Sequence, residues 1–154
     1  MGYAEGTSVS VEKSKAEIEG VLRKYGATSF LSGYDEHKAF VLFQAHGRMV
    51  RFTVKIPQPS DAVFARDGRG STRNQAARER AATAEEMRLW RCLLIAIKAK
   101  LEVVECGIES FEEAFLAQIV LPDGTTTGQW IAPQLDEAYR TAAMPSLMAL
   151  GPGQ

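Results

Sequence analysis

Five arginines between residues 66 and 80 have a type and spacing that suggest a chemical role. They stand in the segment RDGRGSTRNQAARER, among small and polar residues. A guanidinium group is always charged and can hold a phosphate or carboxylate with two parallel hydrogen bonds. Arginine-rich segments without apolar periodicity contact phosphates and become ordered on binding. The chemistry expected of this segment is therefore binding rather than bond making.

Four further cations flank this segment in the sequence. Two lie on the polar side of an alternating strand before it, and two lie on a long predicted helix after it. We expect a nucleic-acid-binding surface made of nine side chains, namely Arg51, Lys55, Arg66, Arg69, Arg73, Arg78, Arg80, Arg88 and Arg91.

The charge of the chain is divided unevenly along the sequence. Residues 48–100 hold twelve Lys and Arg against five Asp and Glu, a net charge of +7. The remainder carries −8, which leaves −1 for the whole chain, and residues 102–137 hold eight acids without any Lys or Arg. This division predicts a basic face with an acidic counterpart elsewhere. The acidic run is expected to stay away from a nucleic acid.

No pattern typical of catalysis or metal binding stands out. His37 and His46 lie in predicted turns, without the cluster of Cys or His ligands that zinc requires. Cys92 and Cys106 have no evident base partner and are expected to pack as small apolar residues. The Gly68-Arg69-Gly70 stretch lacks the Lys-Ser/Thr pair of a phosphate-binding loop. The sequence therefore predicts no catalytic residue, metal or cofactor, and an enzyme is the least supported class, although a site built from dispersed carboxylates stays open.

Apolar periodicity predicts the elements that would position the cations. Alternating residues mark strands, and apolar residues three and four apart mark helices. The predicted elements are a helix at Val11–Tyr25, strands at Thr28–Ser32, Lys38–Ala45 and Arg48–Ile56, and a long helix at Glu85–Cys106. We expect an α+β fold in the order α-β-β-β-α, in which a small antiparallel three-stranded sheet packs on the long helix and C-terminal helices follow.

The middle strand and the long helix predict which residues form the core. The strand stretch AFVLFQA is apolar on both faces, which predicts cover on each side of the sheet. Phe40, Phe43 and Phe52 are expected in the core, so no base-stacking platform is predicted. On the long helix, one stripe lies within about 60° of Trp90 on a helical wheel, and it comprises Trp90, Leu93, Leu94, Ile97, Leu101 and Val104.

The back of the long helix carries a second set of mostly small residues. These are Cys92, Ala96, Ala99 and Val103. Small side chains allow another backbone to approach closely, and the basic and acidic parts of the chain complement each other. Together these features predict a homo-oligomer, most simply a dimer.

A long polar connection, residues 57–83, carries the five central arginines; we call it the arginine arm. Pro59, Gly68 and Gly70 argue against regular structure, so the arm is predicted to be flexible, although a helix from Ala76 onward agrees with the local composition.

The rest of the chain completes one predicted domain. Ser110 is predicted to cap a short helix and Thr127 a last one, which Pro133 interrupts or restarts. Residues 1–143 are expected to form a single domain and residues 144–154 a loose tail. No apolar run is long enough for a membrane span, and the start does not resemble a secretory signal. These features predict a cytoplasmic protein without a membrane partner.

The predicted order of elements is similar to that of double-stranded-RNA-binding domains and of the core of phage single-strand annealing proteins. This is a likeness of topology, which does not determine function, and the arginine arm does not match the lysine signature of the RNA-binding domains. In sequence, the stretches EIEGVLRKYGA, GRMVRFTV and WRCLLIAIKAKLEVVECGIESFEEAFLAQIVLPDGTTTGQWIAPQ resemble small uncharacterised reading frames of bacteriophages and prophages. That resemblance spans about residues 6–140. It implies a phage-encoded accessory protein in the bacterial cytoplasm and brings no site residues with it.

These observations predict non-catalytic binding of DNA, preferably single-stranded, in phage replication or recombination. Two other classes stay open. One is a protein-binding module that inhibits a host enzyme or defence system, in which case the basic surface would meet an acidic host protein. The other is a virion or assembly component.

Overall fold

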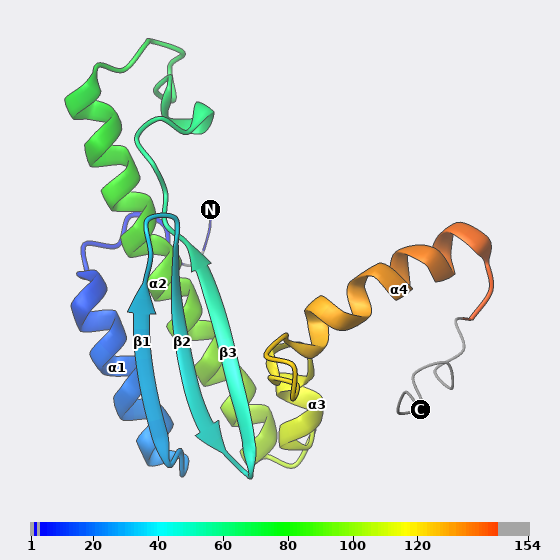
Figure 1. Ribbon diagram of the computed structural model, residues 1–154. Helices are drawn as coiled ribbons and strands as arrows, with labels where there is room; N and C mark the ends of the chain where they lie inside the picture. Colours follow the sequence, from blue (N-terminus) through cyan, green and yellow to red (C-terminus); the bar gives the residue numbers. More distant parts are fainter. Residues whose placement is uncertain (1, 3, 145–154) are drawn as a thin grey trace.

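The computed structural model describes residue 2 and residues 4–144. It confirms the α+β fold and the α-β-β-β-α order (Figure 1). The elements are α1 (Val11–Lys24), β1 (Ser29–Tyr34), β2 (Lys38–Ala45), β3 (Arg48–Lys55), the 3-10 helix η1 (Ala62–Phe64), α2 (Gln75–Glu105), α3 (Phe111–Phe115), the 3-10 helix η2 (Leu116–Gln118) and α4 (Thr127–Thr141). Apart from Met144, the predicted C-terminal tail lies outside the described residues.

The three strands form an antiparallel meander in the order β1-β2-β3. The predicted bounds of β2 are confirmed, and its hairpin with β3 turns at His46 and Gly47, whose φ angles are 51° and 71°. A two-residue hairpin turn of this kind needs positive φ at both central positions, which a glycine supplies without strain. The turn fixes the register in which Ala45 lies opposite Arg48.

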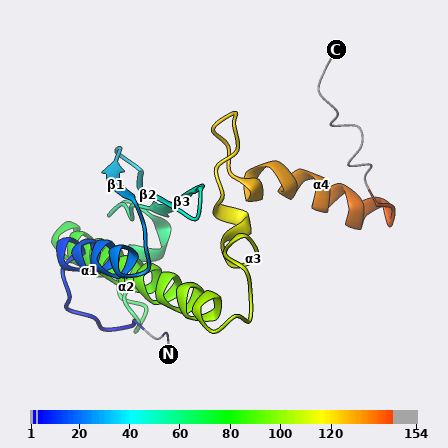
Figure 2. The ribbon, with the colours of Figure 1, turned by 90° about the horizontal axis from the view of Figure 1, so that it is seen from below.

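Helices α1 and α2 cover one face of the sheet, while no helix among the described residues covers the other face (Figures 1 and 2). We call these the inner face and the outer face. Alternation along β2 directs Ala39, Val41 and Phe43 to the inner face, where they are buried. The apolar middle strand predicted cover on both faces of the sheet. Among the described residues, helices cover only the inner face.

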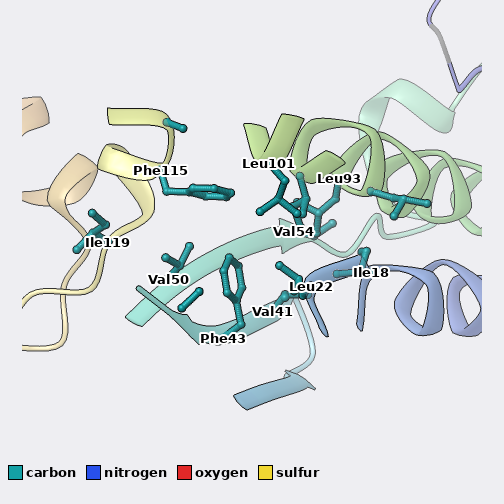
Figure 3. Close-up of a cluster of buried hydrophobic side chains, with 14 of the residues drawn as sticks. Ile18, Leu22, Val41, Phe43, Val50, Val54, Leu93, Leu101, Phe115 and Ile119 are labelled. Carbon is teal, nitrogen blue, oxygen red and sulfur yellow. The ribbon is translucent and has the colours of Figure 1, made fainter. Parts of the chain in front are cut away.

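The core lies between the inner face and the two covering helices (Figure 3). Trp90, Leu94 and Ile97 of α2 are almost fully buried there, beside Ile18 and Leu22 of α1. The predicted stripe of the long helix is confirmed, since Leu93 and Leu101 are buried too and Val104 packs partly against the cluster. Burial of such side chains is the main stabilising contribution to a domain of this size.

Helix α3 docks on the hairpin end of the sheet through aromatic contacts. The ring of Phe115 meets the ring of Phe43 edge-on, with their centroids 5.9 Å apart. Phe111 stacks on His46 at 4.6 Å. Ser110 caps α3 as predicted, and Glu113 completes a capping box with it.

Phe40 corrects one prediction about the core. It lies on the outer face, in a cross-strand row between Gly33 and Thr53, whereas Phe43 is buried as predicted. The Phe40 ring lies over Gly33, where an added Cβ would come within 2.5 Å of the Phe40 Cζ atom. Because β2 is apolar on both sides, its pattern alone does not separate the inner phenylalanine from the outer one.

Two helix starts differ from the prediction. Helix α2 begins at Gln75, ten residues before the predicted Glu85, because Asn74 caps it by accepting a hydrogen bond from the N–H of Ala77. Residues 75–83 of the arginine arm are thus helical. Helix α4 is capped by Thr126 rather than Thr127, and it continues through Pro133. Within the described part of the chain, no helix has the length and apolar character that crossing a membrane requires.

Candidate nucleic-acid interface

The structure separates the nine predicted cations by their surroundings. Five lie in the arginine arm, which includes the first turns of α2 and extends beyond the end of the sheet (Figure 1). Arg51 and Lys55 lie on the outer face, and Arg88 and Arg91 lie further along α2. The surfaces therefore differ in what they can bind.

The loop of the arginine arm, residues 57–74, is held by its own hydrogen bonds. One carboxylate oxygen of Asp67 accepts the N–H groups of Arg69 at 2.8 Å and Ser71 at 2.9 Å. The Asp67 N–H donates to the Ser71 carbonyl at 2.8 Å, and the Arg73 N–H donates to the Ala65 carbonyl at 3.0 Å. An aspartate that bonds to the backbone two residues ahead forms a local turn. Asp67 therefore shapes the loop that presents the arginines.

An apolar contact anchors the loop to α2. Phe64 of η1 is buried, and η1 contacts α2, where Ala82 is buried as well. The arm is thus held both by Asp67 and by this contact. The sequence predicted an arm without regular structure. The structure corrects this, because the arm contains η1 and the first turns of α2.

None of the five arm arginines has a carboxylate oxygen within 4.0 Å among the described residues. The hydrogen bonds of their guanidinium groups go to neutral carbonyl groups. Arg66 donates to Gly70 at 2.9 Å, and Arg78 donates to Arg73 at 3.4 Å. The protein therefore leaves these positive charges without a neutralising partner.

Two of the five arginines line a groove beside the arm. Its volume is about 550 Å³, and Arg66 and Arg73 form part of its wall together with Phe64 and residues 5–7. Asp67 and Glu85 also line it. Asp67 is bonded to the loop backbone and Glu85 to Arg88. A third acid of the groove, Glu5, accepts the Gly2 N–H at 2.9 Å. All three acids thus have other partners, while Arg66 and Arg73 have no carboxylate partner among the described residues.

Arg88 and Arg91 are paired with carboxylates inside the protein. Arg88 donates to both oxygens of Glu85, at 2.8 and 2.6 Å, which lowers the pKa of Glu85 and raises the pKa of Arg88. Arg91 donates to Glu17 of α1 at 2.7 Å, and this hydrogen bond lowers the pKa of Glu17. Arg88 is thus neutralised within its own helix, and Arg91 joins α2 to α1.

Arg51 and Lys55 give the outer face a positive charge. The strands β1, β2 and β3 contain no Asp or Glu. Lys38 lies opposite Lys55 at one end of the sheet. Lys55 Nζ lies 3.7 Å from a carboxylate oxygen of Asp61, and Arg51 Nη2 donates to Gln129 Oε1 of α4 at 3.3 Å. The outer face is thus basic and is attached at one edge to the start of α4.

The two ends of α2 differ in charge, although Glu79, Glu85 and Glu86 also lie in its first half and Lys98 and Lys100 in its second half. Its first turn holds no acid and its last turn no base. Arg78 and Arg80 follow the first turn, whereas Glu102 and Glu105 stand at the other end. From Arg80 to Glu102 the helix rises by about 33 Å. The acidic end is therefore remote from the arginine arm.

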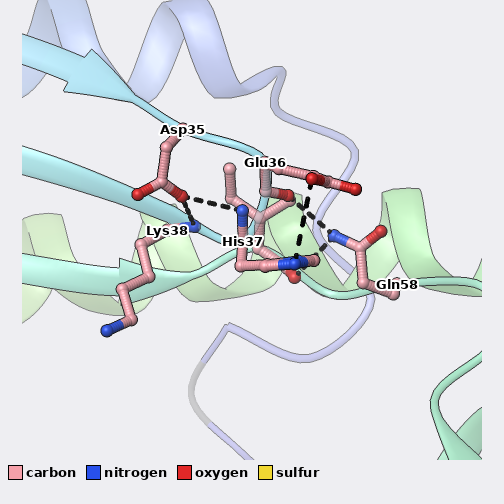
Figure 4. A network of polar contacts seen from close by, with 6 residues as sticks. Asp35, Glu36, His37, Lys38 and Gln58 are labelled. Carbon is pink, nitrogen blue, oxygen red and sulfur yellow. Dashed lines mark hydrogen bonds and ion pairs between the residues drawn. The ribbon is translucent and has the colours of Figure 1, made fainter.

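The histidine and carboxylate residues between β1 and β2 form a structural turn (Figure 4). Asp35 Oδ1 accepts the N–H groups of His37 and Lys38, both at 2.8 Å, and these bonds lower the pKa of Asp35. The Gln58 side chain donates to the Glu36 carbonyl at 3.1 Å and so joins the turn to the arginine arm. Over the residues that the structure describes, no three His, Cys, Asp or Glu side chains gather as metal ligands would.

Three residues that shape this region were not singled out from the sequence. Asp67 organises the loop, Asn74 starts the helix, and Lys38 adds a cation opposite Lys55. The Asp-x-Arg spacing of an aspartate turn and an Asn before a run of Ala were the available signals for the first two.

No protein-family profile, no curated protein and no solved structure matches this chain.

Proposed function

We propose that this chain binds nucleic acid without catalysis and that the arginine arm holds the phosphate backbone. One observation carries the proposal: the arm brings together five arginines that no described carboxylate neutralises, whereas Arg88 and Arg91 are paired. Arginines that meet phosphates release bound counterions, which makes such binding strong at low salt. The proposed site comprises Arg66, Arg69, Arg73, Arg78 and Arg80.

The surroundings of these arginines favour an anion. Arg73 precedes the first turn of α2, where the backbone N–H groups add a positive partial charge. Arg66 and Arg73 line the same groove and offer two guanidinium groups to one strand. Phosphate contacts of this kind hold a strand in place but do not read its sequence. The proposed binding is therefore indifferent to base sequence.

We propose single-stranded DNA as the preferred form. A single strand can bend to place successive phosphates at the groove and along the start of α2, whereas duplex DNA is stiff over such short lengths. The proposed setting is phage replication or recombination in the bacterial cytoplasm. That setting rests on the resemblance of the sequence to phage and prophage reading frames.

The test is a titration of the whole chain against labelled single-stranded and double-stranded oligonucleotides, followed by fluorescence anisotropy at several salt concentrations. If all five arginines meet phosphates of a single strand, log K should fall with log salt with a slope of about −3.5. The single strand should bind more tightly than the duplex. Absence of binding to either form at about 50 mM salt, where such contacts are strong, would exclude the proposal.

A double variant locates the site. Arg69→Ala with Arg73→Ala should reduce the magnitude of the slope by about 1.4, because two phosphate contacts are lost. It should lower the affinity for all base sequences to the same extent. The matched control is Arg23→Ala with Arg140→Ala, which removes the same charge from exposed ion pairs on α1 and α4. Equal losses in the two double variants would indicate a general charge effect rather than a site in the arm.

An acidic protein is the second candidate for the same arginines, because a guanidinium holds carboxylates as well as phosphates. The salt titration separates the two cases. If the wild-type chain binds no oligonucleotide but Arg69→Ala with Arg73→Ala abolishes capture of an acidic protein from a host lysate, the protein-binding alternative replaces the first.

A further inference from the structure

Helix α4 carries an apolar stripe that no other described segment of the chain covers. Ile131, Leu135 and Ala138 recur at helical spacing, and the charged Asp136, Glu137 and Arg140 lie on the opposite side. None of the residues of α4 is buried, and Leu135 is 51% exposed. The stripe borders an open groove of about 500 Å³. In both views the helix extends away from the body (Figures 1 and 2).

A helix of this kind needs a partner surface. It has 15 residues, a length at which isolated helices are marginal in water. Pro133 in its interior also lacks the N–H that would bond to the preceding turn. Thr126 and Gln129 cap its start, but its main contact with the rest of the chain is with η2. The stability of α4 must therefore come from packing of the apolar stripe against another surface.

The outer face of the sheet lacks a cover as well. It presents Leu31, 55% exposed, and Met49, 43% exposed, together with the half-buried Phe40 and Leu42. Leu31, Leu42 and Arg51 form one cross-strand row. An apolar sheet face is normally buried under a second layer. The chain thus has one apolar helix without a sheet and one apolar sheet face without a helix.

The two surfaces agree in size and charge. Helix α4 is about 22 Å long, and the eight residues of β2 span about 26 Å. Three strands about 4.8 Å apart offer the width of one helix. The strands of the outer face carry Lys38, Arg51 and Lys55 and no acid, although Lys55 pairs with Asp61 of the arm. Helix α4 bears a net charge of −1. A helix laid on this face would bury both apolar surfaces and bring opposite charges together.

Contacts at the start of α4 keep it from reaching its own sheet. Val120 donates its N–H to the Met49 carbonyl at 2.8 Å, which holds the preceding segment at the edge of β3. Gln129 Oε1 accepts both the Thr126 N–H, at 2.9 Å, and Arg51 Nη2. From this point α4 leads away from its own sheet (Figure 2). Folding back onto the sheet would break these contacts.

We propose that α4 of one copy packs across the outer face of a second copy. The contact joins two different surfaces, so each copy can give its helix to one neighbour and accept a helix from another. A contact of this kind builds a closed ring or an open chain of copies. It leaves the arginine arm of every copy free, and it does not rest on the proposed binding of nucleic acid.

Light scattering coupled to size-exclusion chromatography tests the proposal on the full chain. The wild-type protein should have at least twice the monomer mass at high micromolar concentration. Leu135→Asp on α4 and Leu31→Asp on the outer face should each yield monomers. The control is Ile108→Asp, which changes an exposed apolar residue between α2 and α3 and should keep the wild-type mass. Circular dichroism of each variant checks that it is folded.

Mixing the two monomeric variants distinguishes this contact from its alternatives. Leu135→Asp keeps an intact outer face, and Leu31→Asp keeps an intact α4, so the mixture should form one 1:1 dimer and nothing larger. A wild-type monomer would overturn the proposal in favour of a helix that folds back or binds another protein. A Leu31→Asp protein that remains a dimer, with no complex in the mixture, would overturn it in favour of direct pairing of two α4 helices.

Discussion

Arg91 and Glu17 join the two helices that cover the sheet, although 74 positions of sequence separate them. Arg91 Nη1 lies 2.7 Å from Glu17 Oε2, and Nη2 lies 3.4 Å from Oε1. Each side chain is one-third exposed or less, and the Arg91 side chain keeps 18% exposure. An arginine that loses its partner in such a setting retains a partly desolvated charge. This pair is therefore a connection between α1 and α2 rather than a feature of the surface.

The pair predicts a specific dependence of stability on pH. Because the Arg91 hydrogen bond lowers the pKa of Glu17, the folded state binds this proton less readily than the unfolded state. The stabilisation is complete above about pH 4.3, which is the ordinary pKa of glutamate. It is lost as the pH falls through the lowered pKa of Glu17 in the folded state. In urea unfolding followed over acidic pH, Glu17→Gln should be less stable than wild type near neutrality, and the two should converge in acid. Parallel pH profiles would contradict this assignment.

The centre of α2 predicts a large loss of stability on truncation. Ile97 has no exposed surface and lies among the buried residues of α1, α2 and the inner face. Ile97→Ala should lower the free energy of unfolding by about 2–5 kcal/mol, through lost burial and the cavity left behind. Urea denaturation measures this loss in the free energy of unfolding. The neighbouring Lys98→Ala, on the exposed side of the same helix, should change stability by less than about 0.5 kcal/mol. A loss that small for Ile97→Ala would mean that the helix faces are assigned wrongly.

Asp67 predicts how easily a protease reaches the arginine arm. Its side chain accepts two backbone N–H groups of the loop, so Asp67→Ala removes both hydrogen bonds at once. Limited trypsin digestion should then cut after Arg66 and Arg69 several-fold faster than in wild type. Circular dichroism should show unchanged helix content, because α2 keeps its Asn74 cap.

A matched variant isolates the loop. Asp123 holds the turn before α4 in a comparable way, by accepting from the N–H and hydroxyl of Thr125. Asp123→Ala should leave cleavage after Arg66 and Arg69 unchanged. Equal acceleration by both variants would point to a general loosening of the protein instead.

The sequence was most informative where local pattern and packing agree. The alternating residues of β3 predicted a strand, and the apolar stripe of α2 predicted the core. Phe40 was misplaced because β2 is apolar on both sides, so the choice of face depends on helices distant in the chain. The start of α2 was placed too late, at Glu85, because residues 75–84 lack an apolar stripe, although the composition allowed a helix from Ala76 onward.

The candidate site was predictable in composition but not in pairing. The arginines of the arm were evident from their density. Arg91 was taken for a free cation because its partner, Glu17, stands on another helix and no local pattern connects them. Glu85, by contrast, precedes Arg88 by three residues, the spacing at which opposite charges on a helix meet. That neutralisation could have been inferred from the sequence.

The charge difference between the two ends of α2 has a consequence for how the protein meets a charged target in solution. Helical peptide groups already place partial positive charge at the first turn and partial negative charge at the last. The arginines near the start and the glutamates at the end add to this field instead of opposing it. The protein should therefore have a large electric dipole moment along α2. Near a polyanion it would rotate before contact, so that most productive encounters begin at the same end, and the association rate would fall steeply with ionic strength.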